Sequence, residues 1–173
     1  MAWNESLTLG KKAERFAEDY FKSQGLNFQD VRDVVEYRKQ DIDYIVDGLG
    51  TVEVKMNLQD ARKYRPGLFF WVETFISEGG KKRPGWFYFS KADYFLFFDK
   101  DGGGIIIKND AVFKNFVNGL LHKGDISWNR FDFCKDVWFS RYDVTAENMR
   151  IYFEQLKQSD VDYRRIVKRK RVY

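Results

Sequence analysis

Residues 41–55 constrain the fold most, because apolar and charged side chains alternate there over two short runs joined by glycines. Successive side chains point to opposite faces of a β-strand, so this alternation predicts a hairpin with one apolar and one charged face. The apolar face would hold Ile42, Tyr44, Val46, Val52 and Val54. The charged face would hold Asp41, Asp43, Glu53 and Lys55. Ile45 is the one apolar residue on the charged side.

The turn decides whether the two charged sets meet. We interpret Gly48-Leu49-Gly50 as a three-residue loop, because glycine tolerates the positive φ that such loops often need. This register places Asp43 opposite Lys55 and diagonal to Glu53, at roughly 7 Å between backbones. Asp41 would then lie one step beyond Lys55. A loop with an even number of residues would separate the charged sets, so the interpretation depends on an odd number.

An aspartate on one strand followed by Glu-x-Lys on the next resembles the PD-(D/E)XK nuclease superfamily, here with Asp43 and Glu53-Val54-Lys55. Residues 10–15, Gly-Lys-Lys-Ala-Glu-Arg, resemble the first helix of archaeal Holliday-junction resolvases and related nucleases. Residues 85–86 and 90–94 are similar to a stretch of some phage and plasmid nucleases. The resemblance covers about the first third of the chain. No proline precedes the aspartate, which leaves Asp41 as an alternative to Asp43.

The resemblance implies a metal-dependent phosphodiester hydrolase. Mg²⁺ prefers oxygen ligands, commonly one or two carboxylates with several waters, and Mn²⁺ is an alternative. Asp43 and Glu53 would be the metal ligands. Lys55 would orient or deprotonate the attacking water, or stabilise the developing charge. Glu14, at the edge of the apolar stripe of its helix, would hold a metal-bound water.

Basic residues are concentrated in two places, although the chain carries a formal net charge of only +4. The first is Lys81, Lys82 and Arg83, expected in a loop with aromatic residues close behind. The second is the C-terminal tail, with Arg164, Arg165, Lys168, Arg169, Lys170 and Arg171. Both sets suit contacts with DNA phosphates, and both are equally typical of solvated surface.

The whole pattern predicts an α/β domain with a mixed central sheet flanked by helices, for which the resemblance implies the restriction-endonuclease-like fold. We expect one domain over residues 1–163 and a basic tail over 164–173. Helices are expected over 6–24 or 8–24, 111–122 with Asp110 as cap, and 149–156. Strands are expected over 28–37, 68–76, 86–89, 94–98 and 105–108, and a loop or short helix over 58–66.

A single cysteine, Cys134, and a single histidine, His122, make a zinc site improbable. We expect a cytoplasmic protein without a membrane span, because no apolar run reaches roughly 18 residues. A non-catalytic module that binds nucleic acid or a protein partner on the same fold is the alternative to the nuclease, and a purely structural protein is a third possibility. The sequence leaves open DNA or RNA, the substrate structure, endo- or exonuclease action, and a homodimer.

Overall fold

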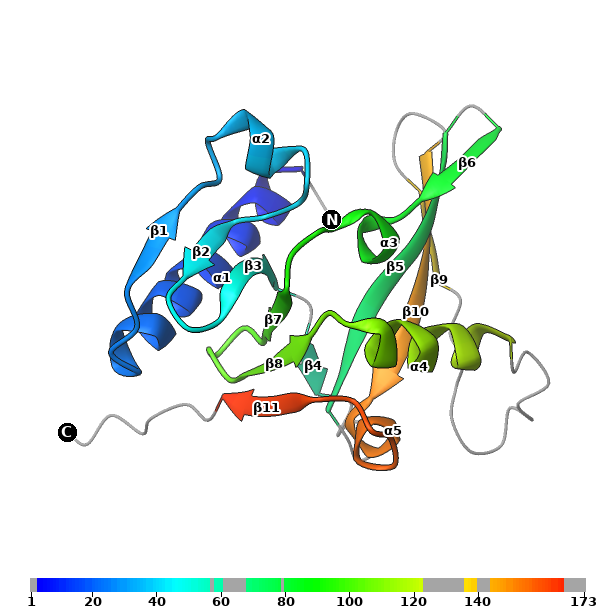
Figure 1. The fold of residues 1–173 in the computed structure, drawn as a ribbon. Helices are drawn as coiled ribbons and strands as arrows, with labels where there is room; N and C mark the ends of the chain where they lie inside the picture. The colour runs from blue at the N-terminus through cyan, green and yellow to red at the C-terminus, as the bar shows by residue number, and fades with distance from the viewer. Residues whose placement is uncertain are drawn as a thin grey trace.

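The computed structural model describes residues 3–56, 58–60, 68–78, 80–122, 136–139 and 144–166, which form a mixed α/β structure with two sheets (Figure 1). The helices are α1 (Trp3–Ser23), α2 (Val35–Arg38), α3 (Trp86–Phe89), α4 (Ala111–His122) and α5 (Phe153–Lys157). One sheet has six strands in the order β1 (Phe28–Asp30), β2 (Tyr44–Val46), β3 (Gly50–Lys55), β7 (Tyr94–Phe98), β8 (Gly104–Lys108) and β11 (Tyr163–Ile166). The other has five strands, β4 (Leu58–Asp60), β5 (Leu68–Glu78), β10 (Val144–Tyr152), β9 (Asp136–Phe139) and β6 (Lys81–Pro84), of which β6 pairs with β5.

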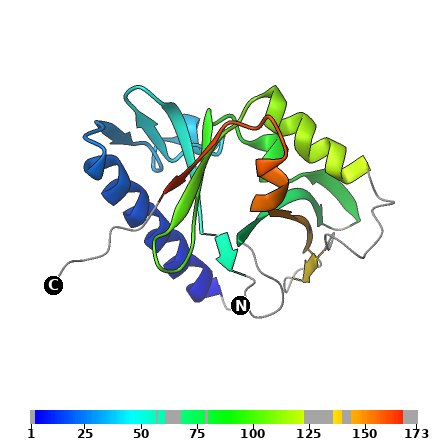
Figure 2. The same ribbon diagram turned by 90° about the horizontal axis from the view of Figure 1, so that it is seen from below.

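The six-stranded sheet is mixed, because β3 and β7 run parallel whereas its other pairs are antiparallel. Helix α1 lies along one face (Figure 2). It buries Ala13, Ala17 and Phe21 against alternate residues of the strands, such as Val52 and Leu96. This face is the apolar side that the sequence predicts for the hairpin.

The opposite face of the six-stranded sheet meets the second sheet. Phe95 and Phe97 of β7 point to this side and form a core with residues of β5, β8, α3, α4 and α5. Phe70 of β5 stacks on Phe97 with 4.6 Å between ring centroids. Charged residues on this face of β3 therefore enter an environment that is largely apolar.

Several expected elements are confirmed. Helix α1 begins earlier than expected and ends one residue before Gln24, and α4 covers the expected 111–122. The side chain of Asp110 accepts the backbone N–H of Phe113 at 3.1 Å, as expected of an N-cap. Strands β5, β7 and β8 are also confirmed, with β5 extending to Glu78.

Three expected elements were wrong. The strand expected over 28–37 is only β1 followed by α2. The segment 86–89 is helical, and the Glu73 carboxylate accepts the N–H of Trp86 in its first turn at 3.1 Å. The helix expected over 149–156 is strand β10 up to Tyr152 and then α5, because residues 149–152 pair with β5.

Three further differences concern the ends of elements. Residues 58–60 form β4 instead of a loop or short helix, and Lys81–Pro84 form strand β6 instead of a loop. Arg164 and Arg165 belong to β11, so the sheet continues into the segment expected as a tail. None of the helices in the described ranges combines the length and apolar character needed to cross a bilayer.

Candidate functional site

The β2–β3 hairpin has the odd-numbered turn on which the predicted site depends, but its register differs by two residues. Tyr44 pairs with Val52 and Val46 with Gly50, so the loop is residues 47–49. Asp47 belongs to this loop and binds Asn27, through its backbone N–H at 2.9 Å and its carboxylate at 3.2 Å. With these contacts to the residue before β1, the turn lies one residue nearer the N-terminus than the predicted loop, 48–50. Because the shift is two residues, the apolar and the charged side chains stay on the faces that the sequence predicts.

Asp43 lies beside Glu53, where the hairpin widens before β2. The backbone N–H of Asp43 donates to the carbonyl of Val52 at 2.9 Å, and its Oδ2 accepts the N–H of Val54 at 2.8 Å. Asp43 therefore binds the residues on both sides of Glu53. Burial raises the pKa of Asp43, and the Val54 N–H and the Lys55 ammonium partly oppose this rise.

Glu53 is the most deeply buried carboxylate of this site, with 3% of its surface exposed. Its neighbour across the parallel pair is Phe95, which explains the loss of solvent. The oxygen Oε2 is buried and has no hydrogen-bond partner. Burial raises the pKa of Glu53 well above its usual value, Lys55 opposes this rise, and the charges of Asp43 and Asp41 add to it. A buried acceptor without a donor is costly and needs an explanation.

Lys55 lies among three groups. Its ammonium forms an ion pair with Glu53 and a second with Oδ2 of Asp41 at 3.4 Å. It also lies 5.3 Å from the centre of the Trp86 ring, within cation–π range. Burial by itself would lower the pKa of Lys55, but the carboxylates of Glu53 and Asp41 outweigh it and the pKa rises. Lys55 is therefore an ammonium ion here.

Asp41 differs most from its expected position. The predicted register placed it one step beyond Lys55, whereas the structure places it in contact with Lys55. The earlier turn accounts for this shift. The structure thus brings together Asp41, Asp43, Glu53 and Lys55.

Glu14 is held at the margin of this group. Its carboxylate forms an ion pair with Arg32, which also binds Asp30. The Arg32 guanidinium lies 5.2 Å from the centre of the Tyr44 ring. Burial raises the pKa of Glu14, Arg32 lowers it, and the charge of Asp43 raises it again. Asp43 therefore acts on Glu14 through its charge, while Arg32 is the contact partner.

Glu73 is a site residue that our sequence reasoning did not select. Strand β5 carries a β-bulge at Thr74, because Phe75 pairs with Glu147 and Glu73 with Asn148. A bulge turns a neighbouring side chain to a new direction. Glu73 consequently reaches α3, and the charges of Lys55, Arg83 and Asp41 act on its pKa, which burial raises. Alternation along the strand places Glu73 on one face with Trp71 and Phe75, but a glutamate there is more often simply exposed, so the sequence did not favour it as a site residue.

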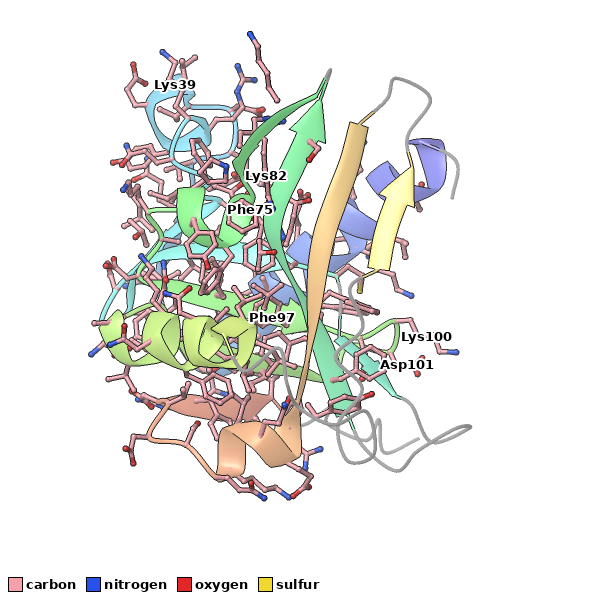
Figure 3. The ribbon with its side chains drawn as sticks, turned by 90° about the vertical axis from the view of Figure 1, so that its right-hand side faces the viewer. Lys39, Phe75, Lys82, Phe97, Lys100 and Asp101 are labelled. Carbon is pink, nitrogen blue, oxygen red and sulfur yellow. The ribbon has the colours of Figure 1, made fainter. Side chains whose placement is uncertain are left out.

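Lys81, Lys82 and Arg83 are exposed along β6. Lys82 lies 4.1 Å from the centre of the Phe75 ring, and the two side chains are seen together in Figure 3. Arg83 is near enough to Glu73 for its charge to lower the pKa of that carboxyl. Strand β6 therefore begins opposite Glu78 at the end of β5 and ends close to the candidate site.

Arg164 and Arg165 are also exposed, but β11 is the edge strand, separated from β3 by β7 and β8. The structure does not bring them to the group around Glu53. Lys168, Arg169, Lys170 and Arg171 lie outside the described residues, as does Cys134.

A search of the described ranges finds no group of three or more His, Cys, Asp or Glu side chains placed to hold a metal ion. The two carboxylates that the sequence predicts as ligands, Asp43 and Glu53, lie together, and Oε2 of Glu53 is buried without a hydrogen-bond partner. Two carboxylates with retained waters are the usual protein contribution to a Mg²⁺ site.

Comparison of this chain with family models, with curated proteins and with solved structures finds no match.

Proposed function

We propose that this chain is a metal-dependent nuclease that hydrolyses phosphodiester bonds in DNA, with α1 and the strands β1, β2, β3 and β7 as a restriction-endonuclease-like core. The observation that carries the proposal is the unpartnered Oε2 of Glu53, buried beside Asp43 and next to Lys55. A protein gains nothing in stability from such an oxygen, whereas a cation would satisfy it.

Asp43 and Glu53 would hold the metal ion, because Mg²⁺ and Mn²⁺ take carboxylate oxygens. When bound, the ion would neutralise phosphate charge and supply an activated water. Hydrolysis joins the water oxygen to phosphorus and breaks the bond to one sugar oxygen. The water gives up a proton to solvent, and the departing oxygen takes one.

Lys55 would orient the phosphate and stabilise the charge that develops on it. An ammonium ion between two carboxylates is a donor, so this role fits the structure better than removal of a proton from water. Glu14 is held by Arg32, which supports an electrostatic role at the margin of the site. The exposed cations of β6 would bind the DNA backbone, which gives affinity without sequence information.

The test is cleavage of supercoiled, linear, branched and single-stranded DNA in Mg²⁺ or Mn²⁺. We compare the wild type with Glu53→Gln and Lys55→Met, and with Glu36→Gln as a control, because Glu36 is exposed on α2. The two site variants should lose about 10²-fold or more in rate, and the control should not.

Cleavage that survives both site substitutions would refute the assignment. DNA binding by the wild type without cleavage of any substrate would favour the alternative, a non-catalytic nucleic-acid-binding module.

A further inference from the structure

Asp41 has an unusual backbone conformation. With φ of 57°, it is the one residue other than glycine with positive φ in the part of the chain that the structure describes. Aspartate and asparagine enter this region more readily than most residues, but it still costs free energy. Such a conformation persists only where its surroundings impose it.

The segment after α3 imposes this conformation. The hydroxyl of Ser90, which is fully buried, donates to the carbonyl of Asp41 at 3.1 Å. The N–H of Lys91 donates to the carbonyl of Gln40 at 2.9 Å. Two successive carbonyls are therefore fixed from outside the hairpin.

The consequence of this anchoring is the position of the Asp41 carboxylate. It lies 3.4 Å from the Lys55 ammonium, which also forms an ion pair with Glu53. Lys55 thus has two carboxylate partners, and only one of them is in the pair that would hold a metal.

We propose that Asp41 is a positioning residue that keeps Lys55 at the site while Glu53 binds the cation, and that Asp41 is not itself a ligand. This inference rests on the proposed nuclease function. Lys55 would lose its ion pair with Glu53 when that carboxylate binds a cation, and its ammonium would be repelled by the positive charge. Asp41 and the Trp86 ring then hold Lys55 beside the phosphate.

The main test is Asp41→Asn, which keeps the size of the side chain and its tolerance of positive φ. Plasmid cleavage should show kcat reduced about ten-fold or more with KM nearly unchanged, because a transition-state interaction is lost. Titration calorimetry with Mn²⁺ should give an affinity close to that of the wild type. Asp43→Asn should lose the Mn²⁺ affinity.

Asp41→Gly distinguishes loss of the positioning carboxylate from loss of stability as the cause of slow cleavage, because glycine accepts positive φ freely and lacks the carboxylate. It should unfold at a temperature no lower than Asp41→Asn, which lacks the same carboxylate, and cleave as slowly as that variant. Asp33→Asn, an equal change of charge at an exposed position nearby, should cleave at the wild-type rate. Wild-type kcat in Asp41→Asn, or loss of Mn²⁺ affinity equal to that of Asp43→Asn, overturns the inference.

A readout independent of cleavage is the NMR signal of the Lys55 side chain in Mg²⁺-saturated protein. It should sharpen or shift between wild type and Asp41→Asn, and stay unchanged in Asp33→Asn. An unchanged Lys55 signal in Asp41→Asn counts against the inference even if cleavage is absent. Cleavage that Glu53→Gln leaves intact instead refutes the nuclease proposal, so the two failures are distinguishable.

Discussion

Replacing Gly50 by alanine should destabilise the hairpin that carries the candidate site by about 2 to 4 kcal/mol. Gly50 has a φ of 103°, and a Cβ there would lie 2.5 Å from Oδ2 of Asp93. The strained backbone costs roughly 1 to 3 kcal/mol. That oxygen accepts the N–H of Thr51 at 2.8 Å and its hydroxyl at 2.7 Å. If Asp93 swings away and one of these bonds is lost, roughly 1 kcal/mol is added.

Urea unfolding followed by tryptophan fluorescence measures this change by linear extrapolation. The matched control is Gly10→Ala in α1, where a Cβ would meet no heavy atom within 4 Å. Alanine is the better helix former, so the control should be as stable as the wild type or up to about 1 kcal/mol more stable. If the two variants unfold within about 0.5 kcal/mol of each other, the account of the turn is refuted.

The remaining predictions concern protons, the bulge and the metal. Because the pKa of Glu53 is raised on folding, the native state retains the proton longer, and this contribution to stability is lost as pH rises from the usual value of 4.5 through the folded pKa. In urea titrations, the unfolding free energy of Glu53→Gln minus that of the wild type should therefore increase with pH over that range. A difference that does not change with pH contradicts the burial argument. Glu73→Gln should keep the acceptor for the Trp86 N–H, whereas Glu73→Leu should cost about 1 to 3 kcal/mol. Equal urea midpoints for the two would show that this hydrogen bond is unimportant. In thermal unfolding, Mn²⁺ at 100 times its Kd should stabilise the wild type by about 2.7 kcal/mol and leave Asp43→Asn unchanged. A shift of equal size in both would exclude Asp43 as a ligand.

Local patterns predicted the elements whose contacts are local. Helices α1 and α4 follow from apolar spacing, and Asp110 marks the start of α4. The faces of the hairpin follow from alternation, because Val52 and Val54 lie in the α1 core while Glu53 points away. These features need no information from distant residues.

The wrong expectations have distant causes. The register of the β2–β3 hairpin differs from the predicted one where the Asn27 amide donates to the carboxylate of Asp47, twenty residues away. Strand β10 replaced the first part of the expected helix because residues 149–152 pair with β5, so tertiary pairing overrode local propensity. Glu73 was not selected because a glutamate on such a strand is usually exposed, whereas its contact with the Trp86 N–H comes from a helix that follows later in the chain.

The parallel pairing of β3 with β7 has a consequence for folding. Between these neighbouring strands the chain forms β4, β5, β6 and α3, so their contact closes a long loop and belongs to a slow, non-local step. While β3 lacks β7 and its Phe95 as a neighbour, Glu53 would be open to water. Docking removes that water, so between its unfolded and folded pKa Glu53 takes up a proton as the sheet closes. Proton uptake in a weakly buffered solution would therefore accompany the burial of this group of carboxyls, because folding also raises the pKa of Asp43, Glu14 and Glu73.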